Sequence, residues 1–542
     1  MRISSRIAVN AVTKWVAQAL HGLVGLVLVP FLIAQLGKPG YGVASLAGVI
    51  VGLSLLADLG LRAALSRQLA EQVARKDDRR YNELASTAMA LYLGIGSVLA
   101  VVCFVLAPKL ATYFAGRKGY ELSPDLLKQA IFLVRWYASS NLLVTFITPV
   151  YGASITSNNR FDLANYTNIV VNLVRLAALL LVLGLTDWQL YGWAAAMFLA
   201  DLALLVCYWV SAHRARPTLR IRPHLVSRSA LRPLFGLGGY LFMFQLTDMI
   251  GVKSDPLVLS RLLGPAALAV YYPALGLASI VRPMVDTLSQ QLYPLTTGFH
   301  VAGQQRSLQE VLIRGTRLTW LMGIGSSVVL IVFADPIMRL WLGRLLGSDY
   351  TYAARVLQAW AIVDLINYAG GTQWSVLLGM QRMSLLAWTA MPFAVVNIVG
   401  SILLVRYTSL GVLGVVVPTI GVLLVRRPII GFYTARLIRL PISVYLREAY
   451  GAPGIVLVCL LAAGLGISRL VPPATLPLLL ADAVLVAVAW AGLSWYIGFS
   501  RQDRQDFLRL GLGFAAGLKG IPRRTGKGFA SPGGRQPDKQ ER

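Results

Sequence analysis

Long apolar runs separated by short polar loops make up most of this chain. The runs lack the strict alternation of apolar and polar residues that β-strands show, and most could cross the ~30 Å hydrocarbon core of a bilayer as α-helices. About fourteen runs have this length. They cover residues 9–33, 43–66, 85–106, 129–151, 163–184, 189–211, 235–258, 266–292, 318–334, 353–377, 385–405, 411–430, 454–471 and 477–498. We therefore predict an all-α polytopic membrane protein with about fourteen transmembrane helices.

The composition agrees with this prediction. Hydrophobic residues make up 56% of the 542 residues and charged residues 13%, against roughly 25% charged residues in an ordinary globular protein. A soluble enzyme, a disordered chain and a disulfide scaffold are therefore disfavoured. Cys103, Cys207 and Cys459 each lie in an apolar run and are interpreted as small buried hydrophobes. The first run is too long for a signal peptide, so we expect an uncleaved first helix.

The formal net charge of +27 would suggest a nucleic-acid partner in a soluble protein. Here Lys and Arg concentrate in alternate loops, as the positive-inside rule requires. The loops at 67–84, 212–234 and 431–452 are strongly basic, whereas those at 107–128 and 335–352 are less so. We therefore expect the first three loops and both termini to be cytoplasmic, and we expect no nucleic-acid partner.

An internal repeat indicates how the chain is organised. A Leu-Gly pair ends the first run at Gly37 and the seventh at Gly264, and a valine follows six residues later in each case, at Val43 and Val270. A parallel repeat of this kind is typical of transporters built from two related halves. The expected parts are an N-terminal lobe of about six helices at 1–211, a basic cytoplasmic linker at 212–234, a second lobe of about six helices at 235–440, two additional helices at 441–498, and a basic, partly disordered cytoplasmic tail at 499–542 that contacts anionic inner-leaflet lipids.

Charged pairs stand inside two of the runs. An ionisable group within a membrane span costs up to ~3 kcal/mol on insertion, so it usually faces a cavity or a partner. Asp58 and Arg62, and likewise Arg282 and Asp286, are four residues apart and have the spacing for an ion pair on one helix face. We interpret both pairs first as structural, with a cavity-facing Arg282 as the alternative.

A polar stripe in the fifth run is the strongest candidate for a binding surface. Asn165, Asn168, Asn172 and Arg175 follow 3-4-3 spacing and therefore share one helix face. A stripe of amides ending in an arginine near the bilayer midplane fits a hydrated cavity. The equally weighted alternative is helix packing, with Arg175 paired to Asp201 on the next helix.

Two further cations lie deep in predicted helices. Arg135 precedes Ser139 and Asn141 in the fourth run, and Lys253 lies in the seventh run between Asp248 and Asp255. The four histidines are scattered, and no phosphate-loop or nucleophile motif is found, so we expect no catalytic, metal or cofactor site. The candidate cavity residues are Arg135, Asn168, Asn172, Arg175, Lys253 and Arg282.

The N-terminal region resembles a known family. Residues 28–37 read LVPFLIAQLG and are followed by GYG at 40–42, then by DLGLRAA at 58–64 and RQLAE at 67–71. This pattern resembles the opening of the Wzx-type polysaccharide biosynthesis flippases, where a Leu-Gly-x-x-x-Tyr-Gly turn joins the first two helices and an Asp-x-Gly precedes a basic loop. These flippases belong to the multidrug, oligosaccharidyl-lipid and polysaccharide exporter superfamily. The likeness covers roughly 8–440 in architecture.

The resemblance implies two six-helix lobes around a central cavity that opens alternately to each side of the bacterial inner membrane. It implies transport of a polyprenyl-pyrophosphate-linked oligosaccharide for exopolysaccharide, O-antigen or capsule, with Na⁺ or H⁺ as a coupling ion and a polysaccharide polymerase as a partner. No catalytic residue carries over, so the chain is expected not to be an enzyme. A pyrophosphate needs cationic groups along its path, and the available ones are Arg135, Arg175, Lys253 and Arg282.

Two alternatives remain open. A cation-coupled multidrug antiporter of the same superfamily would favour an acidic site for an organic cation, and no Glu falls within any predicted helix. A membrane-embedded glycosyltransferase or polymerase would normally carry a sizeable outside loop, whereas the longest outside loops here are short. Both features favour the flippase.

Overall fold

The computed structural model describes residues 3–58, 60–114, 122–235, 249 and 253–505, and every element assigned within these ranges is helical. Ten helices there are long and apolar enough to cross a membrane, or eleven if one bent pair is counted as a span. The prediction of an all-α polytopic membrane protein is confirmed. The count of about fourteen helices is not confirmed, and most of the expected seventh helix lies outside the described residues.

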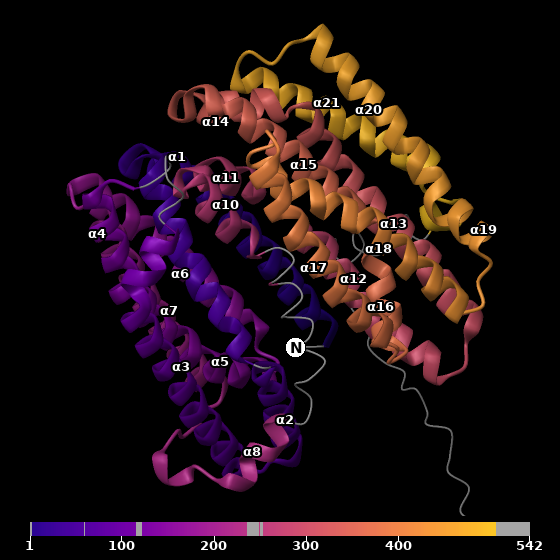
Figure 1. Cartoon of the computed structure of the whole chain (residues 1–542). Coiled ribbons are helices and arrows are strands. Elements are labelled where there is room, and N and C mark those ends of the chain that lie inside the picture. The colour runs from indigo at the N-terminus through magenta and orange to yellow at the C-terminus, as the bar shows by residue number, and fades with distance from the viewer. Residues whose placement is uncertain (1–2, 59, 115–121, 236–248, 250–252, 506–542) are drawn as a thin grey trace, which may run out of the picture.

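The helices between residues 3 and 235 pack together as a first helix group (Figure 1). A proline at the first position and a capping Ser123, whose side chain accepts from the Leu126 N–H, begin α4 in the usual way. The elements of this group are α1 (Ile3–Ser54), η1 (Leu55–Asp58), α2 (Leu61–Arg75), α3 (Asp78–Phe114), α4 (Pro124–Phe132), η2 (Leu133–Ala138), α5 (Ser139–Ser157), α6 (Phe161–Leu185), α7 (Gln189–Ala215), η3 (Pro223–Leu225) and α8 (Arg228–Phe235).

A second helix group follows, and five further helical elements lie against its outer side along α13 (Figure 1). The second helix group comprises α10 (Asp255–Leu263), η5 (Pro265–Ala267), α11 (Leu268–Ala278), α12 (Arg282–Val301), α13 (Gln305–Val332), α14 (Ala334–Leu346), η6 (Gly347–Asp349), α15 (Tyr350–Tyr368), α16 (Gly371–Gly379), α17 (Ser384–Tyr407) and α18 (Leu413–Leu437). The outer elements are α19 (Ile442–Tyr445) with η7 (Leu446–Gly451), α20 (Ala452–Leu470), and α21 (Leu476–Leu493) with η8 (Ser494–Gly498).

The two Leu-Gly turns of the predicted repeat have the same backbone conformation. Gly37 has φ 67° and ψ 170°, and Gly264 has φ 82° and ψ 162°. Glycine alone adopts this region without strain. The chain kinks at Gly37 inside α1, so α1 supplies the first predicted membrane segment and the first part of the second, which continues through η1 into α2. The two Leu-Gly turns therefore match in backbone conformation as well as in sequence.

The two turns also meet where the helix groups touch. A Cβ atom on Gly42 would lie 1.9 Å from the carbonyl oxygen of Pro265, so the backbones approach as closely as glycine permits. The Lys38 ammonium donates to the Leu346 carbonyl at 2.7 Å and to the Asp349 carboxylate at 2.5 Å. Figure 1 shows the groups closest at this end and diverging toward α2 and α16.

The segment between the groups, expected as a linker, packs against the first helix group. The Asn82 side chain of α3 donates to the Thr218 carbonyl at 3.1 Å and accepts from the Arg220 N–H at 2.9 Å. The Arg216 guanidinium lies 4.1 Å from the centre of the Tyr81 ring. Hydrogen bonds to α3 thus hold this segment against the same end of the molecule as α2.

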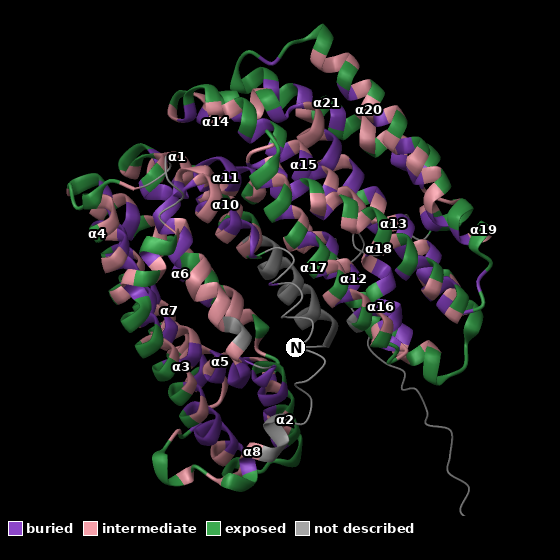
Figure 2. Ribbon diagram, viewed as in Figure 1, coloured by how far each residue is buried: buried purple, intermediate pink, exposed green. Residues whose placement is uncertain are grey.

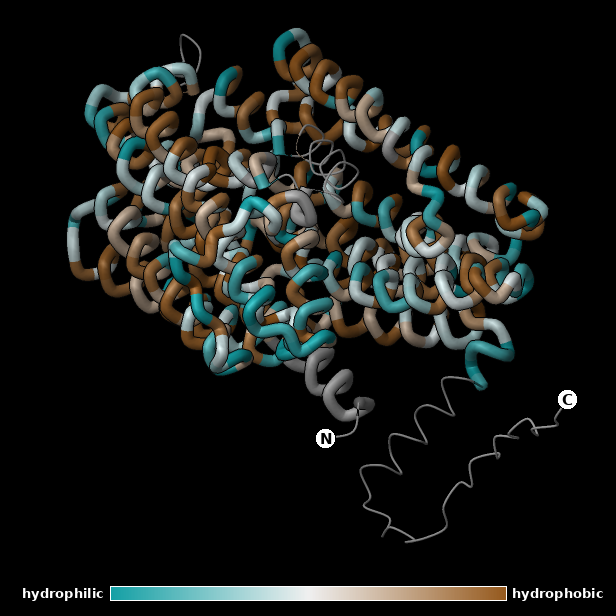
Figure 3. The backbone as a smooth tube through the Cα atoms, turned by 90° about the horizontal axis from the view of Figure 1, so that it is seen from below, coloured by the Kyte–Doolittle hydropathy of each residue, from teal (hydrophilic) through white to brown (hydrophobic). Residues whose placement is uncertain are grey.

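Exposed residues lie along the outer sides of the helices (Figure 2), and many of them are large and apolar. Val98, Val105 and Val488 have 63%, 65% and 65% of their surface accessible. Such a surface suits lipid, because a water-soluble monomer rarely exposes large contiguous apolar patches. Figure 3 shows hydrophobic residues along the helices and hydrophilic ones gathered in the turns. The chain is a multi-pass membrane protein.

Candidate functional site

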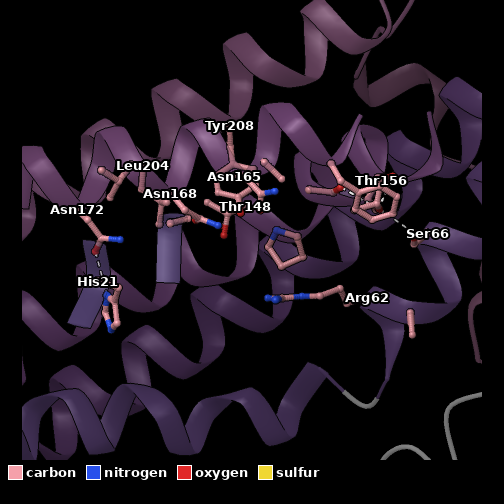
Figure 4. A pocket seen from close by; sticks show the side chains of 18 of the residues that line it. His21, Arg62, Ser66, Thr148, Thr156, Asn165, Asn168, Asn172, Leu204 and Tyr208 are labelled. Atoms are coloured by element: carbon pink, nitrogen blue, oxygen red, sulfur yellow. Dashed lines mark hydrogen bonds between the residues drawn. The ribbon is translucent and has the colours of Figure 1, made fainter. Parts of the chain in front are cut away.

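A large cavity lies inside the first helix group. Its volume is about 1280 Å³, and α1, α2, α5, α6 and α7 contribute its walls (Figure 4). Its polar lining residues are Gln18, His21, Asp58, Arg62, Ser66, Thr148, Thr156, Asn165, Asn168, Asn172, Arg175 and Tyr208. Amides, hydroxyls and guanidinium groups therefore converge on a space large enough for a sizeable polar ligand.

The predicted stripe of α6 forms one wall of this cavity. Asn165, Asn168, Asn172 and Arg175 all line it, because their spacing returns each side chain to the same helix face. Figure 4 shows the three asparagines in a row, with His21 of α1 opposite Asn172. The His21 ring nitrogen and the Asn172 amide oxygen are 3.3 Å apart.

Arg62 reaches the cavity from α2. Gly60 takes a left-handed conformation with φ 77°, so the preceding helix ends and α2 begins in a new direction. The expected Asp58–Arg62 pair on one helix face is therefore wrong. Asp58 is 5% exposed and accepts a hydrogen bond from the Tyr92 hydroxyl at 2.5 Å, while Arg62 points into the cavity (Figure 4).

Arg175 and Asp201 do not form the hydrogen-bonded pair that the packing alternative required. The buried carboxylate of Asp201 accepts its side-chain hydrogen bond from Asn141, and Arg175 lies only within electrostatic range of it. The Nε of Arg175 is buried and has no hydrogen-bond partner within the described ranges. The Arg175 guanidinium therefore lines the cavity without a hydrogen-bonded carboxylate among the described residues.

The structure places the other two predicted cations elsewhere. Arg135 lies in η2, with its guanidinium 5.3 Å from the centre of the Phe104 ring, and it does not line either of the cavities described in this section. Lys253 is exposed just before α10 and is likewise absent from both linings. Asp255, next to it, is fully buried and accepts from the Tyr271 hydroxyl at 3.1 Å. Asp248 lies outside the described residues.

A second cavity, of about 500 Å³, lies in the second helix group between α12, α15, α16, α17 and α18. Arg282 and Asp286 both line it. The hydrogen bonds of the Arg282 guanidinium go to Asp364 of α15, with Nε 3.0 Å from Oδ1. The predicted pairing of Arg282 with Asp286 along one helix is corrected to a pair between helices, because Arg282 is the first residue of α12 and its side chain extends across to α15.

Two of the arginines that line the second cavity were not identified from the sequence. Arg426 and Arg427 fall near the end of the predicted run 411–430 and were not named as cavity residues, but α18 continues to Leu437 and both side chains line the cavity. The Arg427 guanidinium donates to the Asn367 amide oxygen at 2.5 Å. The available signal was the apolar stretch after Pro428, which shows that the helix does not end at these arginines.

Within the described ranges, no group of three or more His, Cys, Asp or Glu side chains is placed to hold a metal ion. The two cavities are lined by hydrogen-bonding and cationic side chains.

Comparison with known proteins gives consistent matches. A family model described as polysaccharide biosynthesis protein matches residues 34–348. The chain is similar to the uncharacterized membrane protein EpsK of Bacillus subtilis, with 20% identity over 93% of this chain and 98% of the relative. It is also similar, at 20% identity over 76% of this chain and 92% of the relative, to a Yersinia pseudotuberculosis protein whose name is that of an O-antigen export protein.

Among solved structures, the chain is similar to the lipid II flippase MurJ in an inward closed conformation. The TM-score is 0.66 at 14% sequence identity, over 90% of this chain and 97% of the other. At this identity the likeness concerns the fold alone.

Proposed function

The chain belongs to the family of polysaccharide biosynthesis proteins, and from this premise we propose that it moves polyprenyl-pyrophosphate-linked oligosaccharide units across the bacterial cytoplasmic membrane by alternating access. The resemblance of the N-terminal motif to polysaccharide flippases is confirmed by that membership. The units would serve exopolysaccharide, O-antigen or capsule synthesis.

The observation that carries this proposal is the amide and arginine lining of the 1280 Å³ cavity. Asn168 and Asn172 offer both donors and acceptors to sugar hydroxyls. Arg175 and Arg62 offer planar guanidinium groups, which bind phosphate oxygens through two hydrogen bonds at once. A polar head can therefore enter the first helix group while an isoprenoid tail stays in lipid.

We propose that the two helix groups are the two lobes of the transporter and that the end bearing α2 and α8 is cytoplasmic. Exposed arginines gather there, including Arg75, Arg79, Arg220 and Arg228, as the positive-inside rule requires. Contacts between the groups at the opposite end would then close the outer side. The described conformation would be open toward the cytoplasm, where the lipid-linked unit is made.

The cavity chemistry weighs against an organic-cation antiporter. An organic cation would meet Arg62 and Arg175 in the cavity wall. The acidic lining residue, Asp58, already accepts a hydrogen bond from Tyr92. Two cations and one engaged carboxylate favour an anionic head group.

The test compares two Arg→Ala variants in a host that depends on the protein for polymer synthesis. Arg175→Ala should abolish most of the polymer yield at normal membrane abundance, because the cavity loses one of its two guanidinium groups. Arg175→Lys should be impaired but normally inserted, since Lys cannot present two parallel donors. Arg135→Ala is the matched control, because Arg135 stacks on Phe104 and should leave the yield unchanged.

Wild-type yield from Arg175→Ala would contradict the assigned role of this residue. Equal losses in both variants at normal abundance would attribute the effect to charge within the membrane rather than to the cavity.

A further inference from the structure

The second cavity holds a buried ion pair that is only half satisfied. The Nε and Nη2 atoms of Arg282 both donate to Oδ1 of Asp364, with Nε at 3.0 Å. Asp364 is 2% exposed, and its other oxygen, Oδ2, is buried and has no hydrogen-bond partner among the residues that the structure describes. Arg282 therefore holds the carboxylate by one oxygen, and the arrangement is weaker than a two-oxygen fork.

The arginine side of this pair is accessible. The Arg282 side chain is 32% exposed and lines the second cavity together with Arg426 and Arg427. Three guanidinium groups thus share a space of about 500 Å³ with Asp286, next to the buried Asp364. An anion entering this space meets a surplus of cations and competes with Asp364 for Arg282.

Loss of Arg282 would leave Asp364 buried without its counter-ion. A buried carboxylate without a partner is too costly to remain charged, so it takes up a proton instead. The proton is drawn from the solvent and forms an O–H bond on one oxygen of the carboxylate. The buried side chain is then neutral. No electron moves in this step.

We propose that Arg282 exchanges Asp364 for a phosphate of the transported lipid, and that Asp364 takes up a proton when this exchange occurs. Substrate binding and proton uptake are then one event. The inference rests on the proposed function, because it takes the pyrophosphate head as the competing anion. It concerns the second helix group, whereas Arg175 belongs to the first.

Other charged and titratable groups set the field around Asp364. Asp286 favours the protonated form because it is a like charge within electrostatic range. Arg427 opposes this effect from α18, within range of Arg282 and Asp286. The remaining groups are Tyr368 on the same helix and Tyr271 on α11, which is in range of Arg282. Burial of Asp364 and its contact with Arg282 thus weigh most in the exchange, and Asp286 adds a smaller effect.

The experiment uses the full-length protein in lipid nanodiscs, with farnesyl pyrophosphate as the probe. Calorimetric titrations in buffers of different ionisation enthalpy count the protons taken up on binding. The wild type should take up about one proton per bound pyrophosphate above pH 7.5, and its affinity should fall about tenfold per unit rise in pH after correction for the ligand's own titration.

Asp364→Asn keeps the size of the side chain and an oxygen that Arg282 can donate to, so the fold should survive. This variant should bind the probe several-fold more tightly, because the competing charge is gone, and without proton uptake or pH dependence. Asp482→Asn is the matched control, since Asp482 is also buried, at 1% exposure, but lies on α21. It should behave as the wild type.

Three outcomes would overturn the exchange. Binding to the wild type without proton uptake would contradict it while leaving the flippase proposal intact. Unchanged proton uptake in Asp364→Asn, or its loss in Asp482→Asn, would assign the proton to another group. Failure of the wild type to bind an isoprenyl pyrophosphate at all would instead overturn the proposed function.

Discussion

At the scale of single residues, Gly42 allows the two helix groups to approach closely. A Cβ atom there would lie 1.9 Å from the carbonyl oxygen and 2.4 Å from the carbonyl carbon of Pro265. Both atoms belong to backbone, so no side-chain rotation relieves the clash. The close approach at this end of the molecule therefore depends on the absence of one methyl group.

We predict that Gly42→Ala separates the two groups at this contact. Overpacking of this kind costs typically 1–3 kcal/mol. This cost should destabilise the conformation in which the two groups touch at Gly42. The thermal midpoint of the purified protein should fall and polymer yield should drop. Gly48→Ala is the matched control on the same helix, because nothing lies within 4 Å of its added Cβ.

In the control, the higher helix propensity of alanine should leave stability unchanged or slightly raised. Equal behaviour of the two variants would show that the Gly42 contact has no role in closing the molecule.

At the scale of helices, one buried carboxylate helps to attach the outer elements α19–α21 to the second helix group. Asp503 follows η8, is 5% exposed, and receives a hydrogen bond from Arg317 of α13 at 2.8 Å. Arg317 also donates to the Glu448 carbonyl in η7 at 3.0 Å. The Ser500 hydroxyl and N–H both donate to Asp503. These contacts connect α19–α21 to the second helix group.

We predict a pH-dependent contribution from Asp503. Burial raises the pKa of Asp503, but hydrogen bonds from Ser500 and Arg317 outweigh burial and lower it below its ordinary value of 3.8. A lowered folded-state pKa means that the stabilisation is present above pH 3.8 and is lost as the pH falls through the lowered value. Asp503→Asn should therefore destabilise the protein by roughly 3 kcal/mol at pH 7, because Arg317 loses its charged partner.

The measurement is thermal unfolding from pH 7 down to pH 3, with hydrogen exchange of α20 and α21 as a local readout. The difference between wild type and Asp503→Asn should shrink at the acid end. Asp125→Asn removes an exposed partner of Lys128 and should change stability by less than about 0.5 kcal/mol. A difference that persists unchanged to pH 3 would contradict the role of the charge.

Residue spacing in the sequence predicted features within single helices. It could not predict the contacts between residues far apart in the chain. The 3-4-3 spacing of Asn165, Asn168, Asn172 and Arg175 is a property of one helix, so a shared face followed from the sequence. The partner of Arg282 is Asp364, 82 positions away, and no spacing rule points to it. Residues four apart were the natural partners by helix geometry, but a helix break at Gly60 removed one such pair.

At the scale of the whole molecule, a few polar contacts join the two groups at one end. Lys38 of α1 binds Asp349 and the Leu346 carbonyl. The Trp341 indole N–H donates to the Leu26 carbonyl at 2.9 Å, and the Arg261 guanidinium lies 4.8 Å from the centre of the Tyr113 ring. Ile33, Tyr41 and Leu46 of α1 also share a hydrophobic core with the second helix group, so apolar packing holds this contact beside the polar pairs.

We predict that Lys38→Asp shifts the protein away from the described conformation. The pair is partly exposed, so its loss should cost no more than about 1 kcal/mol, which corresponds to roughly a fivefold change in population. Spin labels at Arg79 and Arg306, in a background without native cysteines, would report the separation of the opposite ends. In the variant, a smaller fraction of molecules should show the longer distance between the two labels.

Restoring the opposite charges in swapped positions, with Lys38→Asp and Asp349→Lys together, should recover part of the longer distance. The carbonyl contact of Lys38 would remain lost, so recovery should be incomplete. A single variant with an unchanged distance distribution would show that this pair does not bias the two conformations.

Duplication of a half-length ancestor would explain the matching turns at Gly37 and Gly264. In a dimer of two identical halves the contact would be isologous, with the same residues on both sides. At the offset of 227 residues between the glycines, Lys38 corresponds to Pro265, and Gly42 corresponds to Ala269. The two halves of this chain therefore differ where they meet: one carries a lysine that binds Asp349, and the other carries a proline that packs on Gly42.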